Sequence, residues 1–333
     1  MVTVALLGFG LSGRYLQAPY LLANPNFRLK TILSGNQNPQ EIYPGVSVSR
    51  SLDEILNDPE IDFISVATPN DTHYEYAKKA LLAGKHVLIE KPFAANTEQA
   101  NELIELSKKQ NKVLTVFQNR RFDSDFRTVR QIVQSGVLGE LLSYEAHFDR
   151  YKPVLNTKQW KETVSPMSGI LFDLGSHLID QAISLFGTPD EVAGETFIQR
   201  ENSSVDDAFN VRLSFGKLKV TLKSSLLVRE EGPRYVLHGT KGSFVKYGMD
   251  IQEDQLKAGL KPGSVDFGKE PAANRGLLNT EINGLHFRGT VETLDGNWDI
   301  LFQNIYEAIT EGKELLVKPE QVAEQLKVIG KIR

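Results

Sequence analysis

The sequence predicts two domains of different architecture: an α/β domain with a parallel sheet, then an α+β domain with a largely antiparallel open sheet. Its 333 residues are too many for one ordinary core, at roughly 100–200 residues per domain. The strand-like runs also change character, being nearly continuous in apolar residues before residue 118 and alternating with polar residues after about residue 140. We therefore expect domains over residues 1–120 and 121–333.

The first part of the chain alternates strands of the buried type with helices. The strand-like runs are Val2–Leu7, Ile61–Ala67, His86–Ile89 and Val113–Phe117, and helical patterns cover Asn70–Ala83 and Asn96–Gln110. Ser51 with Glu54, and Asn96 with Gln99, have the spacing of a capping box at a helix start. Pro19 is expected to kink the first helix. Continuous apolar strands that alternate with helices predict a parallel sheet covered on both faces.

The second part shows the period-two alternation of strands with one buried face. Phe209–Phe215 alternates strictly, and Leu218–Lys223 repeats the pattern, which is typical of an antiparallel sheet. The stretch 254–290 is rich in Gly, Asn and Lys with little periodicity, and we expect a long loop there. Further helices are expected over Leu171–Phe186, Asn297–Glu311 and Pro319–Ile329. The last two close the chain and could pack back on the first domain.

Composition and charge exclude several classes of function. With 38 Lys+Arg against 42 Asp+Glu, the formal net charge is -4, so no basic surface for nucleic acid or anionic lipid is expected. No apolar run approaches the roughly 18 residues of a membrane-spanning helix, and Met1–Val4 lacks the basic start of a secretory signal. The absence of cysteine excludes disulfides, thiolate metal sites and a Cys nucleophile. A cytoplasmic enzyme fits this composition.

A glycine pattern follows the first strand directly: Gly8-Phe9-Gly10-Leu11-Ser12-Gly13. Gly8 permits a tight turn, Gly10 lets a pyrophosphate approach the backbone, and Gly13 allows the helix to pack closely on the strand. The helix that follows offers N–H donors and the positive end of its dipole to phosphates. An ordinary Gly-rich turn is the alternative, but the strand–turn–helix context predicts a dinucleotide cofactor bound by residues 8–13.

The side chain that would recognise the cofactor's ribose follows the second strand, Phe27–Leu33, which continues into Ser34-Gly35-Asn36-Gln37. No carboxylate stands there to bind a 2′-hydroxyl and repel a 2′-phosphate. Ser34 and Asn36 could donate hydrogen bonds to such a phosphate, so NADP(H) is favoured. No Arg follows to clamp the phosphate, which keeps NAD(H) as the alternative, and Ser34 could also simply start a turn.

Two further motifs resemble those of the glucose–fructose oxidoreductase/inositol dehydrogenase (Gfo/Idh/MocA) family. The segment from Thr68-Pro69-Asn70 and His73 leads to the hallmark Glu90-Lys91-Pro92, and a second hallmark, an Asp and a His four apart on a helix, stands as Asp173 and His177. The resemblance runs along essentially the whole chain. It implies an N-terminal Rossmann domain, a C-terminal domain on an open sheet, and an active site between them.

Longer motifs are similar to the NADP-dependent scyllo-inositol dehydrogenase branch of this family. They are Asn119–Phe126, Arg150–Pro153, Gly232–Tyr235 and Lys246–Asp254. The resemblance implies substrate binding by Lys91, Arg120, Tyr151, Asp173 and His177. It also implies cofactor contacts, supported for some residues by their position after a strand, at Thr68, Asn70, His73, Glu90, Lys91, Asn119, Trp160 and Lys161. At Lys161 relatives commonly carry Arg, and Lys loses the planar fork that binds two oxygens at once.

Lys91 follows a buried strand at the carboxyl edge of the sheet, where ligands of such folds bind. The resemblance implies that it contacts the substrate hydroxyl and the nicotinamide ribose and assists proton transfer, and its cation could stabilise a developing alkoxide. A solvated surface Lys is the alternative. Glu90 is expected to orient Lys91, and Pro92 to hold the turn, with a cis bond as one hypothesis.

Asp173 and His177 are four apart in a helical run, so both are expected on one face of the helix. His177 is the best candidate for general acid/base work, because the pKa of a histidine ordinarily lies near neutrality. Asp173 could bind a neighbouring hydroxyl or hold His177 in position. A surface pair, a buried structural His and a metal-binding pair are the alternatives. Since the six histidines show no further ligand pattern, no metal is expected.

Together these features predict an NAD(P)-dependent oxidoreductase that transfers hydride between nicotinamide and a polyol or keto-sugar, with scyllo-inositol and NADP(H) as the best match. An aldose 1-dehydrogenase or another sugar-ketone reductase is the alternative among enzymes. A non-catalytic, cofactor-sensing regulatory protein is the alternative from another class, and the intact Glu90-Lys91-Pro92, Asp173 and His177 argue against it. Because the outer face of an open sheet needs covering, a homodimer or homotetramer is expected.

Overall fold

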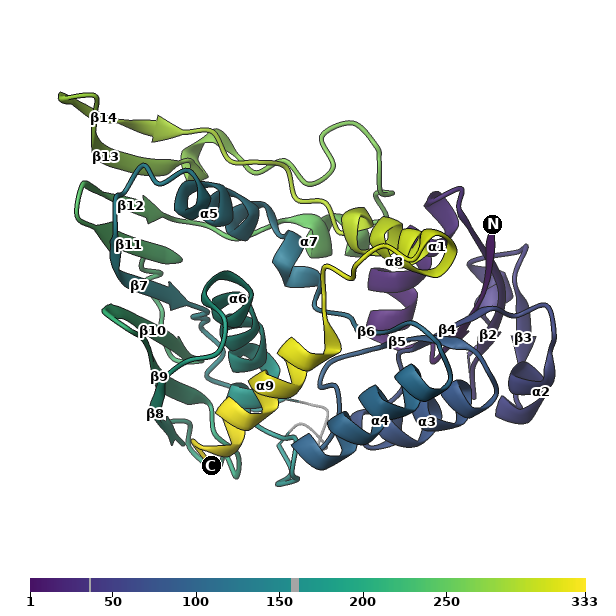
Figure 1. Cartoon of the computed structure of the whole chain (residues 1–333). Coiled ribbons are helices and arrows are strands. Elements are labelled where there is room, and N and C mark those ends of the chain that lie inside the picture. The colour runs from purple at the N-terminus through teal and green to yellow at the C-terminus, as the bar shows by residue number, and fades with distance from the viewer. Residues whose placement is uncertain (36, 157–161) are drawn as a thin grey trace. The chain divides into compact units, whose positions relative to one another are not determined.

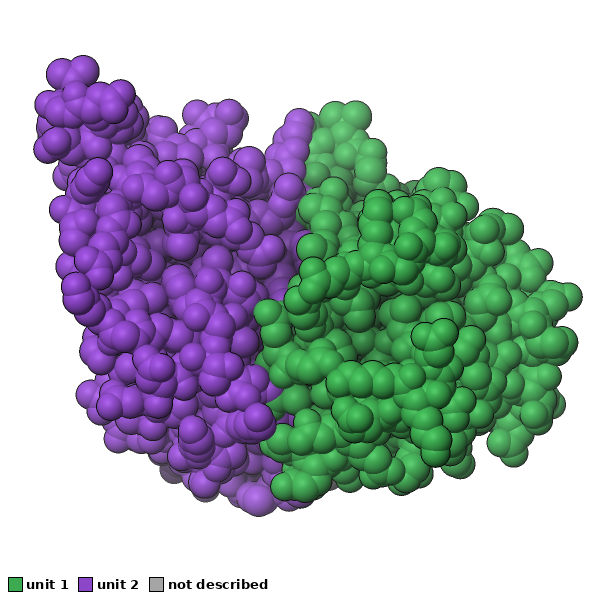
Figure 2. Space-filling model, in the orientation of Figure 1, with its two compact units in different colours: residues 1–119, 252–267, 297–323 green, residues 120–251, 268–296, 324–333 purple. Residues whose placement is uncertain are grey.

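The computed structural model describes residues 1–35, 37–156 and 162–333. The chain forms two compact units (Figure 2). Unit 1 comprises residues 1–119, 252–267 and 297–323, and unit 2 comprises residues 120–251, 268–296 and 324–333. Asn36, Trp160 and Lys161, which the sequence analysis singled out, lie outside the described residues. Among the described residues, no helix has the length and apolar character needed to cross a membrane.

Unit 1 is built on a six-stranded parallel sheet with the strand order β3-β2-β1-β4-β5-β6 (Figure 1). All six residues of β1 are buried, because helices cover both faces of such a sheet and leave no wet side. The predicted parallel sheet is therefore confirmed. The strands are β1 Val2–Leu7, β2 Phe27–Leu33, β3 Ser47–Ser49, β4 Phe63–Val66, β5 His86–Ile89 and β6 Leu114–Val116.

The helices of unit 1 include one supplied late in the sequence. Figure 1 shows α3 and α4 on one side of the sheet and α1 and α8 on the other. The Tyr20 ring of α1 stacks on Phe302 of α8 at 5.5 Å, and Phe302 also lies 5.9 Å from Phe117 after β6. The segments are η1 Ser12–Gln17, α1 Ala18–Ala23, η2 Pro39–Glu41, α2 Leu52–Asn57, η3 Asn70–Thr72, α3 His73–Leu82, α4 Thr97–Lys109, α7 Gln252–Lys257 and α8 Asp299–Glu311.

Local signals in the sequence explain where several of these helices begin. Ser51 accepts a hydrogen bond from the Glu54 amide, and Asn96 accepts one from the Gln99 amide at 2.9 Å. The first helix changes from π-helical η1 to α-helical α1 just before Pro19, whose missing N–H is tolerated in the first turn of a helix.

Unit 2 is built on an eight-stranded sheet with the order β14-β13-β12-β11-β7-β10-β9-β8. Only the β7–β10 pair is parallel among the described strand pairs of this sheet. Buried and more exposed residues alternate along β10, which confirms the largely antiparallel sheet with one buried face. The strands are β7 Leu141–His147, β8 Glu191–Phe197, β9 Ala208–Phe215, β10 Leu218–Ser225, β11 Tyr235–Gly239, β12 Gly242–Lys246, β13 Gly276–Ile282 and β14 Leu285–Val291.

Helices α5 and α6 cover the buried face of this sheet (Figure 1). Phe126 of α5 lies 6.5 Å from the Tyr235 ring of β11, and Phe186 of α6 lies 5.5 Å from Tyr144 of β7. The helical segments of unit 2 are η4 Asn119–Phe122, which starts at the last residue of unit 1, α5 Ser124–Gln134, η6 Leu171–Gly175, α6 Ser176–Phe186 and η7 Ala272–Asn274. Helix α9, Pro319–Gly330, begins in unit 1 and ends in unit 2.

The expectation of one long loop over 254–290 is wrong. Helix α7 runs into this stretch, and β13 and β14 form a hairpin at the sheet edge. Its turn is Asn283-Gly284, with φ of 51° and 80°, the sequence and backbone of a tight hairpin turn. The alternation is weak because β14 lies at the edge with no buried residue, so its sequence carries little apolar pattern.

Candidate active site

The glycine loop after β1 has the geometry that a dinucleotide pyrophosphate needs. Gly8 has a φ of 100°, and a β-carbon there would lie 2.5 Å from the Ala67 carbonyl oxygen; at Gly13 it would lie 2.2 Å from the Gly8 oxygen. Both positions therefore exclude any larger residue. A β-carbon on Gly10 would meet nothing within 4 Å, so the backbone at this point is open. The loop thus fits an NAD(P) pyrophosphate next to the first turn of η1.

The other side chains of this loop differ in how far they are buried. Phe9 is buried with its ring edge-on to Tyr43 at 6.0 Å, whereas Leu11 is 49% exposed. Ser12 begins η1 and accepts a hydrogen bond from the Gln17 side chain at 3.0 Å.

Gln17 joins three parts of the site, and the sequence analysis missed it. This fully buried side chain donates to Ser12 and, at 3.1 Å, to the Glu90 carboxylate, while its oxygen accepts from Ser65 of β4 at 2.5 Å. The Gly-loop helix is thereby tied to the Glu90-Lys91-Pro92 turn. The available signal was a polar residue in an otherwise apolar stretch, but its partners lie 48 residues away on β4 and 73 residues away in the turn after β5.

Lys91 lies in the turn after β5, at the carboxyl edge of the parallel sheet, and is partly exposed. The Lys91–Pro92 bond is cis, which agrees with the hypothesis made for Pro92 from the sequence. The imidazole of His73, which is fully buried, places Nδ1 2.8 Å from the Pro92 oxygen and Nε2 2.9 Å from the Thr68 oxygen. Burial lowers the pKa of His73. His73 thus connects the turn of Lys91 to the loop after β4. The expected contact of His73 with the cofactor stays a prediction.

The other predicted cofactor residues of unit 1 also follow strands of the parallel sheet. Thr68 and Asn70 come after β4, where the Thr68 hydroxyl lies 2.6 Å from that of Thr72 and Asn70 begins η3. Asn119 comes after β6 and is buried. The carboxyl ends of these strands share one edge of the sheet, the edge at which doubly wound folds bind ligands.

Ser34 follows β2 and has an unexpected neighbour. Its hydroxyl donates to the Gln37 carbonyl at 2.9 Å. The guanidinium of Arg50, directly after β3, donates to the carbonyl oxygens of Ser34 and, at 3.3 Å, Gln37. Parallel pairing sets Leu33 opposite Ser49, which makes Ser34 and Arg50 neighbours. Arg50 was not expected at this point from the sequence, because it follows β3 rather than β2 along the chain.

Asp173 and His177 lie on one continuous helical segment of unit 2, as predicted, but with an irregularity between them. The first turn, η6, is π-helical and carries Asp173, and α6 then carries His177. Asp173 is exposed, whereas His177 is only 6% exposed, so the imidazole is not a surface group. π-Helical turns occur frequently at functional sites.

Asp206 anchors the start of this segment and was also missed from sequence. Its carboxylate accepts the Leu171 amide at 2.8 Å, and its carbonyl accepts the Ile170 amide at 2.8 Å. Gly169 makes this approach feasible, since a β-carbon there would lie 1.9 Å from an Asp206 carboxylate oxygen. The spacing of 35 residues between Asp206 and Leu171 left no local signal.

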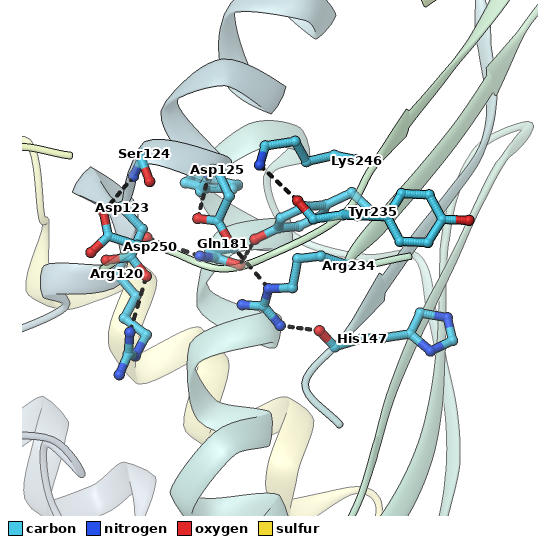
Figure 3. A network of polar contacts seen from close by, with 12 residues as sticks. Arg120, Asp123, Ser124, Asp125, His147, Gln181, Arg234, Tyr235, Lys246 and Asp250 are labelled. Atoms are coloured by element: carbon cyan, nitrogen blue, oxygen red, sulfur yellow. Dashed lines mark hydrogen bonds and ion pairs between the residues drawn. The ribbon is translucent and has the colours of Figure 1, made fainter. Parts of the chain in front are cut away.

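Arg120 sits in a buried polar network that joins η4 to α6 and β11 (Figure 3). Its guanidinium donates to Asp123 at 3.1 Å, and its carbonyl accepts from Gln181 at 2.9 Å. The Gln181 oxygen in turn accepts from the Tyr235 hydroxyl at 2.9 Å. Gln181 stands four residues after His177 on α6, so this network places Arg120 beside the helix of the candidate general acid/base.

A second contact fixes the same two elements. Arg121 forms a bidentate pair with Asp180, both bonds at 2.7 Å and both side chains buried. The matched fork of Arg and carboxylate gives this contact geometric precision. Tyr151, by contrast, is 44% exposed, forms an isolated bridge with Leu227, and places its hydroxyl 2.5 Å from Arg229.

The predicted site residues therefore fall into two groups. Unit 1 holds the cofactor group, namely residues 8–13, Ser34, Thr68, Asn70, His73, Glu90, Lys91 and Asn119. Unit 2 holds Arg120, Tyr151, Asp173 and His177. Among the described residues, no group of three or more His, Asp or Glu side chains could hold a metal ion.

Two family models cover almost the whole chain. Residues 2–118 match the Gfo/Idh/MocA model described as an oxidoreductase family, NAD-binding Rossmann fold, and residues 130–332 match its C-terminal alpha/beta domain. The chain belongs to the Gfo/Idh/MocA oxidoreductase family. It is accordingly an NAD(P)-dependent oxidoreductase with an NAD(P)-binding Rossmann domain.

Individual relatives are similar over nearly their full length. The uncharacterized oxidoreductase YhhX of Escherichia coli is 39% identical, covering 99% of this chain and 95% of that protein. The scyllo-inositol 2-dehydrogenase (NADP(+)) IolW of Bacillus subtilis is 35% identical, covering 98% and 92%. A crystal structure of a putative oxidoreductase from Bacteroides fragilis has a TM-score of 0.92 at 43% identity, covering 99% of this chain and 96% of that one.

Proposed function

We propose that this protein interconverts a polyol and its keto form with NADP(H), and that scyllo-inositol is the best candidate polyol. The observation that carries the proposal is the pairing of an open Gly loop with the residues of both hallmark motifs, Lys91, Asp173 and His177. The similarity to IolW, a scyllo-inositol 2-dehydrogenase, supports the choice of substrate.

Each of the three residues has a distinct task in the oxidative direction. The Lys91 ammonium binds the substrate oxygen and stabilises the negative charge that develops as its proton leaves. The His177 imidazole accepts that proton, and the Asp173 carboxylate accepts a hydrogen bond from an adjacent hydroxyl, which orients the ring. Bound NADP(+) supplies the hydride acceptor. In the reductive direction, His177 returns the proton.

The choice of NADP(H) rests on the loop after β2. Ser34 and the guanidinium of Arg50 meet there, and no carboxylate stands in residues 34–37. A 2′-phosphate would find a cation and the Ser34 hydroxyl at this point, whereas NAD(H) would lack the carboxylate that commonly binds its 2′-hydroxyl.

The test is the initial rate of NADPH formation from scyllo-inositol, with NADP+ and NAD+ side by side and Lys91→Ala as the comparison. We expect turnover with a preference for NADP+. In Lys91→Ala the rate should fall about 100-fold or more, because the alkoxide loses its cation. The Kd of NADPH should change little. Turnover of Lys91→Ala at the wild-type rate would overturn the role of Lys91. Tight NADPH binding with no turnover of any polyol or aldose would favour the regulatory alternative.

A further inference from the structure

We propose that Gln17 is a positioning residue that holds the Glu90-Lys91-Pro92 turn in place and leaves the hydroxyl proton of Ser12 for the cofactor. This inference rests on the proposed function and deepens it, because it names a residue outside both hallmark motifs on which the work of Lys91 depends. Gln17 is the last residue of η1, the helical turn that follows the Gly loop.

Gln17 is a polar side chain in an apolar setting. It is fully buried, and its helix neighbours Leu16, Ala18 and Leu21 are buried apolar residues. Taking an amide out of water costs free energy unless hydrogen bonds replace its contacts with water. A Met side chain has a similar length and would pack in such a place without that cost. The amide is therefore explained by the hydrogen bonds that it makes rather than by packing.

These hydrogen bonds use both ends of the amide. Its oxygen accepts from the fully buried Ser65 hydroxyl at 2.5 Å, and its nitrogen donates to Ser12 at 3.0 Å and to Glu90 at 3.1 Å. Because a carboxylate only accepts hydrogen bonds, the nitrogen has to face Glu90 and the oxygen has to face Ser65. With its two N–H groups divided between Ser12 and Glu90, the amide has a single orientation.

The π-helical form of η1 makes the contact with Ser12 possible. Ser12 and Gln17 are five residues apart at the two ends of η1, and the Ala18 amide donates to the Gly13 carbonyl, also five residues back. Five residues are about 1.4 turns of an α-helix, which would turn the two side chains to different faces. In the wider π-turn they share one face, and such turns occur frequently at functional sites.

The same amide thus holds the Gly loop and the turn of Lys91. Because the Ser12 oxygen accepts from Gln17, its own proton is left for another acceptor, and a pyrophosphate next to the first turn of η1 would supply one. The Glu90 carboxylate is held directly before Lys91 in the chain. A carboxylate held there keeps the Lys91 ammonium charged and oriented.

Substitutions of Gln17 and Ser65 test this role through kcat for scyllo-inositol and the Kd of NADPH. Gln17→Met removes the amide and should lower kcat about 10-fold, the loss of a hydrogen bond to a charged group, while the Kd of NADPH stays within about 3-fold. Gln17→Glu should raise the Kd of NADPH about 10-fold, because the introduced carboxylate accepts the Ser12 proton and repels the pyrophosphate. Ser65→Ala only releases the amide oxygen, so it should lower kcat about 3-fold. It keeps the test decisive if thermal unfolding shows that the Gln17 variants do not fold.

A double-mutant cycle separates positioning from a purely structural role. If Gln17 acts through Glu90, Gln17→Met should change kcat less than about 2-fold in a Glu90→Gln background, whereas a structural role would give the full loss again. A second readout needs no turnover: the rate at which an amine-acylating reagent labels Lys91, followed by peptide mass spectrometry. Gln17→Met should raise this rate about 3-fold or more, because Lys91 loses the negative charge that keeps it protonated.

Gln303 of α8 supplies the matched control. Its amide also donates to a carboxylate, that of Glu307 at 3.0 Å, and its oxygen accepts from Asn26, which precedes β2 at the amino edge of the sheet. Gln303→Met and Gln303→Glu should therefore leave kcat, the Kd of NADPH and the labelling of Lys91 within about 2-fold of the wild type.

The outcomes separate this inference from the proposed function. Wild-type kcat and Lys91 labelling in folded Gln17→Met, or an equal loss of kcat with and without Glu90→Gln, would overturn the role of Gln17 and leave the proposed function standing. An unchanged Kd of NADPH in folded Gln17→Glu would overturn the effect on Ser12. Faster Lys91 labelling in Gln17→Met, in a protein that turns over no polyol or aldose, would support the role of Gln17 and overturn the proposed function.

Discussion

The pairing of β2 with β3, rather than proximity in the sequence, brings Arg50 to the candidate site. It stands 16 residues after Ser34, and its guanidinium donates to the Ser34 carbonyl. Side by side, the two residues put a cation and a hydroxyl at the end of β2, where the ribose of a dinucleotide is recognised. A guanidinium at this point favours a 2′-phosphate through charge-assisted hydrogen bonds.

Replacing Arg50 with Ala should change cofactor preference without affecting the fold. We expect the Kd of NADPH to rise about 10-fold, the loss of one charge-assisted hydrogen bond, while the Kd of NADH stays within about 2-fold. Fluorescence titration of both cofactors measures this directly. Arg28→Ala is the control, because Arg28 is an exposed residue of β2 that pairs with Glu60. An equal weakening of NADPH and NADH by Arg50→Ala would contradict the assignment.

At the scale of elements, the junction of β5 and β6 contains a titratable contact. Nδ1 of His86, the first residue of β5, accepts the Val113 amide at 2.9 Å just before β6 begins. Burial, with a smaller contribution from Lys112, lowers the pKa of His86 to about 4. The ring is thus neutral in the folded protein, and a proton on Nδ1 would remove the acceptor that the Val113 amide needs.

Acid should therefore destabilise the protein through His86. Between about pH 6.5 and pH 4 the unfolded chain binds a proton that the folded chain does not, so stability is present above pH 6.5 and is lost as the pH falls toward 4. Allowing for the partly exposed ring, this should amount to roughly 1–2 kcal/mol. Denaturant unfolding at pH 7 and pH 4.5 measures it. His86→Gln keeps an acceptor without titrating and should lose less; an equal loss in both proteins would refute the contribution of His86.

At the scale of the whole molecule, one face of the eight-stranded sheet carries an apolar stripe. Val236 of β11 pairs with Val245 of β12, which pairs with Leu277 of β13, and all three are partly exposed. The residues adjacent to them along these strands, Leu237, Phe244 and Leu278, are buried, because successive side chains of a strand point to opposite faces. We propose that a second copy of the chain covers this stripe.

Sedimentation of the wild type at about 10 μM should reveal a dimer or tetramer, because a stable dimer with a submicromolar Kd remains associated at this concentration. Val245→Glu should dissociate it, because a buried unpaired carboxylate costs several kcal/mol. Leu82→Glu is the matched control: it introduces the same charge at an exposed apolar residue of α3 in unit 1. A monomeric wild type, or a Val245→Glu protein of unchanged mass, would exclude this face as the interface.

The sequence alone determined the features that depend on residues near one another in the chain. Strands β1, β2 and β5 have the predicted bounds, and for β1 and β5 the reason is that a nearly continuous apolar run is visible within a few residues. The turn of Gly8 and the close packing of Gly13 were predicted from their spacing. The hairpin over 276–291 was missed because an edge strand buries too little to leave a pattern.

Which distant side chains meet depends on the packing of the folded chain. The contacts of Gln17 with Glu90, Ser34 with Arg50, and Arg234 with Asp125 join residues 73, 16 and 109 positions apart. Their positions depend on strand register and on how each helix packs, and periodicity in the sequence constrains neither. Lys91, Asp173 and His177 could be named from short motifs, whereas the side chains that hold and surround them emerged from the fold, because a contact across a sheet leaves no mark on the residues beside it in the chain.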